Sequence, residues 1–208
     1  MNELHWIGLL VGMRHALDAD HVAAVASLVS VDKGLTKKQA LNHGMFWGIG
    51  HSITLILVAS VVIIMGQSLP ATWSLWLETA VGVMLVFLGI SIFYRFRSLP
   101  SNKHSSKQVS DGGVVKGRAL AVGSMHGLAG SSVLMIILME SMPDLMSRIL
   151  YLILFSVGSI IGMVIVSGLI SLPLVKAQMN VHLRQWLYSL IAVVTLFIGV
   201  EIIISNMF

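Results

Sequence analysis

Six long apolar stretches decide what this chain can fold into. They cover residues 4–30, 40–66, 73–96, 117–140, 147–176 and 183–205, and each is close to or longer than the roughly 20 residues that a helix needs to cross a bilayer. Of the 208 residues, 56% are hydrophobic and only 11% are charged, a composition that excludes a soluble domain. We therefore expect an all-α integral membrane protein with six transmembrane helices.

The two halves of the chain resemble each other weakly. Residues 11–17 align with 122–128 at an offset of 111, and residues 76–89 align with 186–199 at an offset of 110. Three helices per half is an odd number, so the second half must be inverted in the membrane relative to the first. Inverted repeats are typical of secondary transporters. The sequence predicts a first three-helix repeat at 1–96, a cytoplasmic loop at 97–116 and a second three-helix repeat at 117–208.

The basic residues fix the expected orientation. Of the thirteen Lys and Arg residues, eleven lie in or beside the connections 31–39, 97–116 and 177–182, all on one side of the predicted bundle. By the positive-inside rule this side is cytoplasmic and both termini are outside. The net charge of +4 therefore reflects membrane topology, and we expect the lipid bilayer, not nucleic acid, as a partner. Glu3 and His5 are candidates for an acidic outer mouth that concentrates cations, although both are also ordinary residues for a helix end.

The first apolar stretch contains five ionisable residues within eight positions. Ionisable groups at bilayer depth cost roughly 2.5 to 3.5 kcal/mol each on the insertion scale, so they persist where they pair, face water or bind a ligand. A polar network that merely locks helices together is the simpler alternative, but so dense a network serves packing poorly. The five residues are Arg14, His15, Asp18, Asp20 and His21.

Histidines on three predicted helices converge on one depth. From the helix rise of about 1.5 Å per residue, His15, His51 and His126 each lie roughly 14 to 17 Å from a membrane surface, near the middle of a core roughly 30 Å thick. Neutral imidazole is the usual ligand of nickel, cobalt, copper and zinc, and carboxylates compensate the charge of the ion. The sequence predicts a divalent-metal site formed by His15, Asp18, Asp20, His21, His51 and His126.

Helical geometry leaves two arrangements of the carboxylates open. On a regular helix His15, Asp18 and His21 share one broad face, whereas Asp20 points away. Either the helix loosens between Ala16 and Asp20, as helices of transporters do at their sites, or one carboxylate orients a metal-bound imidazole. Arg14 stands one turn before Asp18 and is expected to pair with it. Further supporting candidates are Ser52 and, more weakly, Ser131.

Two of these segments resemble the motifs of the nickel/cobalt transporter family. Residues 14–22, RHALDADHV, resemble its His-x4-Asp-His signature, matched at His15, Asp20 and His21. Residues 46–54, FWGIGHSIT, resemble its second motif, whose Gly-His-Ser centre is matched at 50–52. The resemblance implies transport of Ni²⁺ or Co²⁺ at these histidines and aspartates, with the ion as substrate and no cofactor.

The later half of the chain is similar to one branch of that family. Larger members are similar to a plan with an acidic Asp-Thr-Ala-Thr-Glu motif, where this chain instead has HGLAGSS at 126–132. In this respect the chain looks more like the shorter branch of urease-accessory nickel permeases. This branch implies a multi-pass protein of the bacterial cytoplasmic membrane with a functional link to urease or hydrogenase maturation. Resemblance to the efflux branch of the family would imply a histidine-rich cytoplasmic loop. The predicted loop here holds only His104, which favours uptake.

We therefore predict a permease that takes up Ni²⁺ or Co²⁺ and is not an enzyme. The chain lacks a phosphate-binding Gly-x4-Gly-Lys-Ser/Thr motif, so transport relies on gradients. Export of the same ions is the first alternative. An intramembrane zinc hydrolase is the second, but the sequence has no His-Glu-x-x-His motif. Whether the chain works alone or as a homodimer stays open. His43, near the inner end of the second predicted helix, is expected at the membrane interface.

Overall fold

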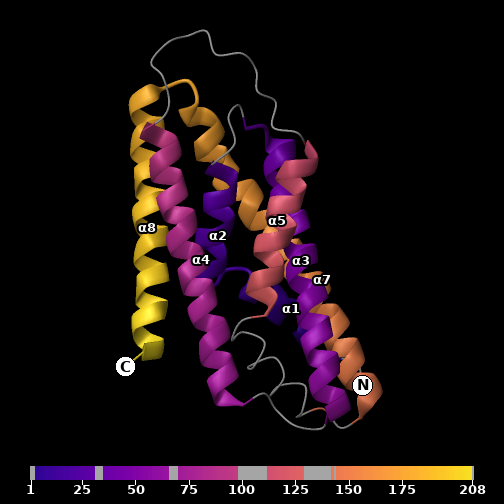
Figure 1. The fold of residues 1–208 in the computed structure, drawn as a ribbon. Helices are drawn as coiled ribbons and strands as arrows, with labels where there is room; N and C mark the ends of the chain where they lie inside the picture. Colours follow the sequence, from indigo (N-terminus) through magenta and orange to yellow (C-terminus); the bar gives the residue numbers. More distant parts are fainter. Residues whose placement is uncertain are drawn as a thin grey trace.

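The computed structural model describes residues 3–30, 35–65, 70–97, 112–128, 142 and 144–207. This part of the chain is all-helical (Figure 1) and contains seven helices. They are α1 (Glu3–His15), α2 (Ala19–Ser30), α3 (Lys37–Met65), α4 (Ala71–Arg97), α5 (Gly112–Gly127), α7 (Leu145–Ala177) and α8 (Val181–Met207). Four of them, α3, α4, α7 and α8, are long and apolar enough to cross a membrane.

Polar caps set the start of three of the long helices. Before α3, Thr36 and Gln39 form a capping box, in which the Gln39 backbone N–H donates to Thr36 Oγ1 (3.2 Å) and the Thr36 N–H donates to Gln39 Oε1 (2.8 Å). Asp144 caps α7 by accepting a hydrogen bond from the Ser147 N–H (2.8 Å). Asn180 does the same for α8. Each cap satisfies a backbone donor that the first turn leaves unpaired.

The helices confirm four of the six predicted spans as continuous helices. The predicted span 4–30 is instead divided at residues 16–18 into α1 and α2. The predicted span 117–140 is described only as far as Leu128, and its helix α5 ends at Gly127. This helix begins at Gly112, inside the predicted loop 97–116, whose residues 98–111 lie outside the described part of the chain.

The division between α1 and α2 is a tight turn within the bundle. Hydrogen bonds from Leu17 N–H to Arg14 O (2.8 Å) and from Asp18 N–H to His15 O (3.1 Å) shorten the last turn of α1. The helix resumes when Val22 N–H donates to Asp18 O (3.0 Å). The turn lies partway along the long helices (Figure 1). The first of the two arrangements that the sequence left open, a helix loosened between Ala16 and Asp20, is therefore observed.

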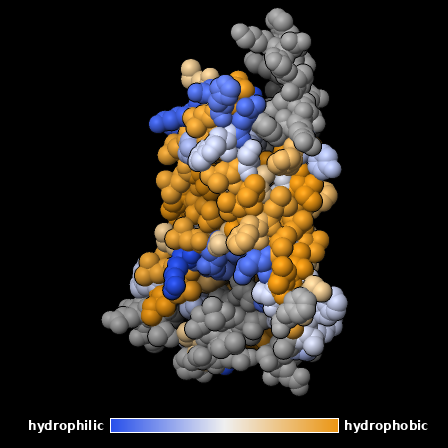
Figure 2. Space-filling model, turned by 90° about the vertical axis from the view of Figure 1, so that its left-hand side faces the viewer, coloured by the Kyte–Doolittle hydropathy of each residue, from blue (hydrophilic) through white to orange (hydrophobic). Residues whose placement is uncertain are grey.

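Close backbone approaches join the helices in pairs. The most extensive packing is between α4 and α8, α3 and α5, α1 and α7, and α3 and α7. Glycines face the neighbouring backbone in all four pairs, as expected where helices associate by direct packing in lipid. The lipid-facing surface stays apolar: Trp186 and Phe197 on α8 are exposed, and Figure 2 shows a broad hydrophobic belt on the face where α8 lies.

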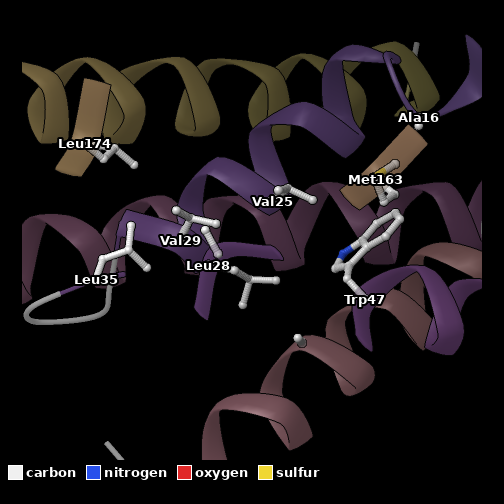
Figure 3. Packing of buried hydrophobic residues seen from close by; sticks show 10 residues of the cluster. Ala16, Val25, Leu28, Val29, Leu35, Trp47, Met163 and Leu174 are labelled. Atoms are coloured by element: carbon white, nitrogen blue, oxygen red, sulfur yellow. The ribbon is translucent and has the colours of Figure 1, made fainter. Parts of the chain in front are cut away.

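Two clusters of buried apolar residues lie toward opposite ends of α3. The Trp47 cluster consists of Ala16, Val25, Leu28, Val29, Leu35, Ala40, Trp47, Ala119, Met163 and Leu174. In Figure 3, Trp47 and Met163 lie at the end of this cluster next to Ala16, and Leu35 and Leu174 lie at the other end. The Phe155 cluster consists of Leu55, Ala59, Val62, Tyr151, Leu152 and Phe155. Along α3 these clusters leave the segment around His51 between them.

Candidate metal centre

Four histidine rings from four helices meet at the turn between α1 and α2. His21 lies at the centre, with its ring centroid 4.3 Å from that of His15, 5.3 Å from His51 and 4.9 Å from His126. His15 ends α1, His21 lies in the first turn of α2, and the other two lie on α3 and α5. His51 is 14 residues after Lys37 and 13 before Ile64 in its apolar span, so the group lies at mid-depth.

Two of the imidazoles are oriented by carboxylates. Asp18 Oδ2 lies 2.7 Å from His15 Nδ1, and Asp20 Oδ1 lies 2.9 Å from His21 Nδ1. The other oxygen of Asp20 lies 3.5 Å from His126 Nε2. With a carboxylate accepting from Nδ1–H, the lone pair of each imidazole stays on Nε2. In metal sites, a ligating histidine commonly donates its other ring N–H to a carboxylate in this way.

The nitrogens that face one another are unsatisfied. Among the described residues, His15 Nε2, His21 Nε2 and both ring nitrogens of His51 are buried without a hydrogen-bond partner. A buried polar atom left unpaired costs free energy, and four rings with such atoms in one place would be costly without a ligand. His51 and His126 are fully buried, and His21 is 1% exposed.

The ligand atoms fall into two overlapping groups. In each group, one ligand atom from every residue lies within 4.8 Å of the others. The first group is His15, His21 and His51, and the second is Asp20, His21 and His126. His21 belongs to both. One carboxylate and four imidazoles form a hard-to-intermediate donor set, which suits divalent ions such as nickel, cobalt and zinc rather than copper(I).

Helix ends add a favourable field for cations. Helix α1 ends at His15 and α5 ends at Gly127, the residue after His126. The C-terminus of a helix carries roughly half a negative elementary charge from its aligned peptide dipoles. Two such ends beside the imidazoles favour a cation there. The N-terminus of α2 has the opposite sign, and Asp20 in its first turn compensates it.

The carboxylates differ in their access to solvent. The side chain of Asp18 is 53% exposed and that of Asp20 is 28% exposed, whereas His15 is 10% exposed. Asp18 therefore touches the group only through His15. Asp20 faces two imidazoles of the group directly, a contact that an unbroken helix would not allow.

Some predicted supporting residues lie elsewhere. Within the described residues Asp18 pairs with His15, and the expected ion pair with Arg14 does not form because the turn carries Asp18 away from the α1 face. Arg14 is exposed instead. Ser52 is buried and donates to the backbone oxygen of Ser156 on α7 (3.4 Å). His43 is 3% exposed and lies six residues after the start of α3, so it is buried within the bundle near that end of the helix.

The structure leaves three candidates undescribed and adds one residue that the sequence analysis missed. Ser131 lies outside the described residues, as do the side chains of Glu3 and His5. The added residue is Trp47, whose ring stacks on His51 with centroids 5.3 Å apart and planes 8° apart. An aromatic residue in an apolar helix is normally core, and its spacing of four residues from His51 was the available signal.

The chain is similar to known proteins over much of its length. The family model described as "NicO: High-affinity nickel-transport protein" matches residues 4–112. The chain is 28% identical to the Urease accessory protein UreH of Bacillus sp. (strain TB-90), over 94% of this chain and 88% of that protein. No solved structure matches.

Two proteins of Arabidopsis thaliana are also similar. Chloroplast protein FOR GROWTH AND FERTILITY 2 is 23% identical over 98% of this chain, and FOR GROWTH AND FERTILITY 1 is 24% identical over 76% of it. The chain spans about half the length of these two proteins, 56% and 47% respectively. The family match covers more than half of the chain and includes His15, His21 and His51. This chain therefore belongs to the NicO family of high-affinity nickel-transport proteins.

Proposed function

We propose that this multi-pass membrane protein is a permease that takes up Ni²⁺, and also Co²⁺, through the histidine group at the turn between α1 and α2. One observation carries the proposal. His15 and His21 each present a buried Nε2 without a partner among the described residues while a carboxylate holds Nδ1. The family consists of transporters, so the chain is not an enzyme, and the zinc hydrolase alternative is set aside.

The geometry of the group suits a transported ion. An ion held by His15, His21 and His51 needs only a short displacement to be held by Asp20, His21 and His126, because His21 belongs to both groups. A site for transport must bind its ion without trapping it. Ni²⁺ and Co²⁺ are neighbours in the divalent affinity series and accept the same imidazole and carboxylate ligands, so we expect both to enter.

Matching glycine contacts support two inverted repeats. In two helix pairs, glycines pack against carbonyl oxygens of the partner: Gly12 on Phe155 and Gly158 on Leu9 between α1 and α7, and Gly123 on Trp47 and Gly50 on Leu120 between α5 and α3. The two α1 residues in these contacts precede the two α5 residues by 111 positions. The two α3 residues precede the two α7 residues by 108 positions. A twofold relation between the halves accounts for this exchange of partners.

The α4 and α8 pair follows the same relation. Gly89 packs on the carbonyl oxygen of Ala192, and Gly199 packs on that of Gly82. With an offset of 110, α4 (Ala71–Arg97) corresponds to α8 (Val181–Met207) from end to end. The metal group then lies where the repeats meet, which is the usual place for the site of a secondary transporter.

The charge distribution supports an inward direction. We propose that the end of the bundle with the basic connections is cytoplasmic, that both termini are outside, and that the protein lies in the cytoplasmic membrane of a bacterium. A membrane potential of 100 mV then supplies about 4.6 kcal/mol for an inward-moving divalent ion. The relative named as a urease accessory protein supports a functional link to urease, and we extend this proposal to hydrogenase maturation as another use of nickel.

Uptake of ⁶³Ni²⁺ into proteoliposomes with an imposed potential, inside negative, tests the proposal. We expect His21→Ala and His51→Ala to abolish uptake while the protein stays in the membrane. His43→Ala is the matched control, because it removes another buried histidine of α3 outside the group. Normal uptake by both test variants would refute the site. Nickel accumulation that falls in cells making the protein would indicate the export alternative.

A further inference from the structure

Two buried aromatic side chains touch the histidine group. Besides stacking on His51, the ring of Trp47 lies 5.1 Å from that of His21 and 5.3 Å from that of His126. Phe155 on α7 lies 5.4 Å from the ring of His15. Trp47 is 0% exposed and Phe155 is 3% exposed. Either ring is therefore in direct contact with a side chain that we propose as a ligand.

The two aromatic rings lie on opposite sides of the group. Trp47 precedes His51 by one helical turn and belongs to the Trp47 cluster with Leu35 and Ala40, toward the Lys37 end of α3. Phe155 belongs to the Phe155 cluster with Leu55 and Val62, toward the Met65 end. Each aromatic ring, with the apolar cluster behind it, thus lies between the histidine group and one end of α3.

The rings also occupy corresponding positions in the two halves. The offset of 108 that relates α3 to α7 takes Trp47 to Phe155, and the offset of 111 that relates α1 to α5 takes His15 to His126. The contact of Trp47 with His126 therefore corresponds to that of Phe155 with His15. Each half of the chain places one aromatic ring against a histidine of the other half.

The indole N–H of Trp47 indicates that its ring can adopt a second position. Its indole N–H is buried and has no acceptor among the described residues. Buried indole N–H groups normally find a partner, and an unpaired donor costs free energy. Rotation of the ring away from the histidines toward water would recover that cost, while its backbone stays fixed by the close approach of Gly123.

We propose that Trp47 and Phe155 are the two gates of the transport path, one for each side of the membrane. In the structure both rings lie against histidines of the group, which is the closed position of each gate. Opening of Trp47 exposes the histidines toward the Lys37 end of α3, and opening of Phe155 exposes them toward the Met65 end. This proposal rests on the proposed function, because a gate has a role only if an ion passes.

Thiol accessibility tests the gates without nickel. The chain has no cysteine, so His21→Cys places a single thiol between the two rings. A membrane-impermeant, cationic methanethiosulfonate reagent is added to right-side-out or inside-out vesicles. We expect Trp47→Ala to accelerate labelling at least tenfold from one face only, and Phe155→Ala to do so from the opposite face only.

Exposed aromatic residues provide matched controls. Trp186→Ala and Phe197→Ala remove a ring of the same kind from the lipid-facing side of α8, where these residues are 62% and 70% exposed, and should leave both labelling rates unchanged. Trp47→Leu and Phe155→Leu, which keep the core filled, should show the same side preference with smaller factors. Acceleration from the same face in both variants, or from neither face in folded protein, would overturn the gates. Because no metal is present, this outcome is distinct from a failure of wild-type protein to transport nickel.

Discussion

Gly123 gives the sharpest test of how closely the fold controls the metal centre. A Cβ at this position would overlap the carbonyl oxygen of Trp47 and lie 2.8 Å from its carbonyl carbon. Ordinary contact begins at 3.4 Å, so Gly123→Ala must move α5 and α3 apart by at least about 0.6 Å. Both contacting atoms belong to helix backbone, and neither can turn aside.

The displacement falls directly on the ligands. His126 follows Gly123 by three residues, and His51 follows Trp47 by four, so both rings move with their helices. Metal–ligand distances tolerate only about 0.2 Å, a third of the required shift. We expect at least a tenfold loss of Ni²⁺ affinity, about 1.4 kcal/mol. Overpacking should also lower the stability by about 1 to 3 kcal/mol, more than the gain of up to about 1 kcal/mol from replacing a helical glycine.

The assay compares Gly123→Ala with Gly117→Ala on the same helix. A Cβ at Gly117 meets nothing within 4 Å, so this control should bind nickel like wild type and gain slightly in thermal stability. Equilibrium binding of ⁶³Ni²⁺ to purified protein measures the affinity, and thermal unfolding in detergent measures the stability. Wild-type affinity in Gly123→Ala would refute the reasoning that this backbone contact sets the ligand geometry.

Three further predictions follow from individual contacts. Asp18→Asn should weaken nickel binding 10- to 100-fold because it disturbs only the orientation of His15, and Asp20→Asn should weaken it more; equal losses in ⁶³Ni²⁺ binding would contradict this ranking. Binding should weaken on acidification, because protons and the metal ion compete for the same imidazole lone pairs; binding that shows no such competition at any pH at which the protein stays folded would contradict imidazole ligation. Removing the hydrogen bond between Ser27 and Thr195 (3.0 Å) by Ser27→Ala and Thr195→Val should give a coupling energy of about 0.6 kcal/mol in a double-mutant cycle of thermal unfolding; a cycle that sums to zero would show that this bond adds nothing.

Apolar length was sufficient to predict the long helices. In α3, α4, α7 and α8 nothing in the sequence competes with a continuous span, and their bounds agree with the predicted ones to within a few residues. The histidines of α3 and α5 could likewise be placed at one depth from the helix rise alone. These features depend on local sequence and on the thickness of the bilayer, both of which can be read directly.

The turn at residues 16–18 could be posed as an alternative but not decided from the sequence. Part of the stabilisation of this turn is tertiary, because Asp20 faces His126 on another helix as well as its neighbour His21. The predicted pairing of Arg14 with Asp18 was wrong for the same reason, since it assumed a regular helix. Trp47 was missed because its contacts with three histidines come from three different helices.

The position of His21 in both ligand groups limits how many ions the protein can hold. With Nδ1 engaged by Asp20, the ring has a single lone pair, on Nε2. One lone pair binds one ion at a time, so the two groups are alternative binding positions for the same ion. In the proposed site a second ion therefore cannot bind through His21 until the first has left. For the proposed site this single imidazole therefore sets an expected stoichiometry of one nickel per chain, which suits a carrier that releases each ion before it binds the next.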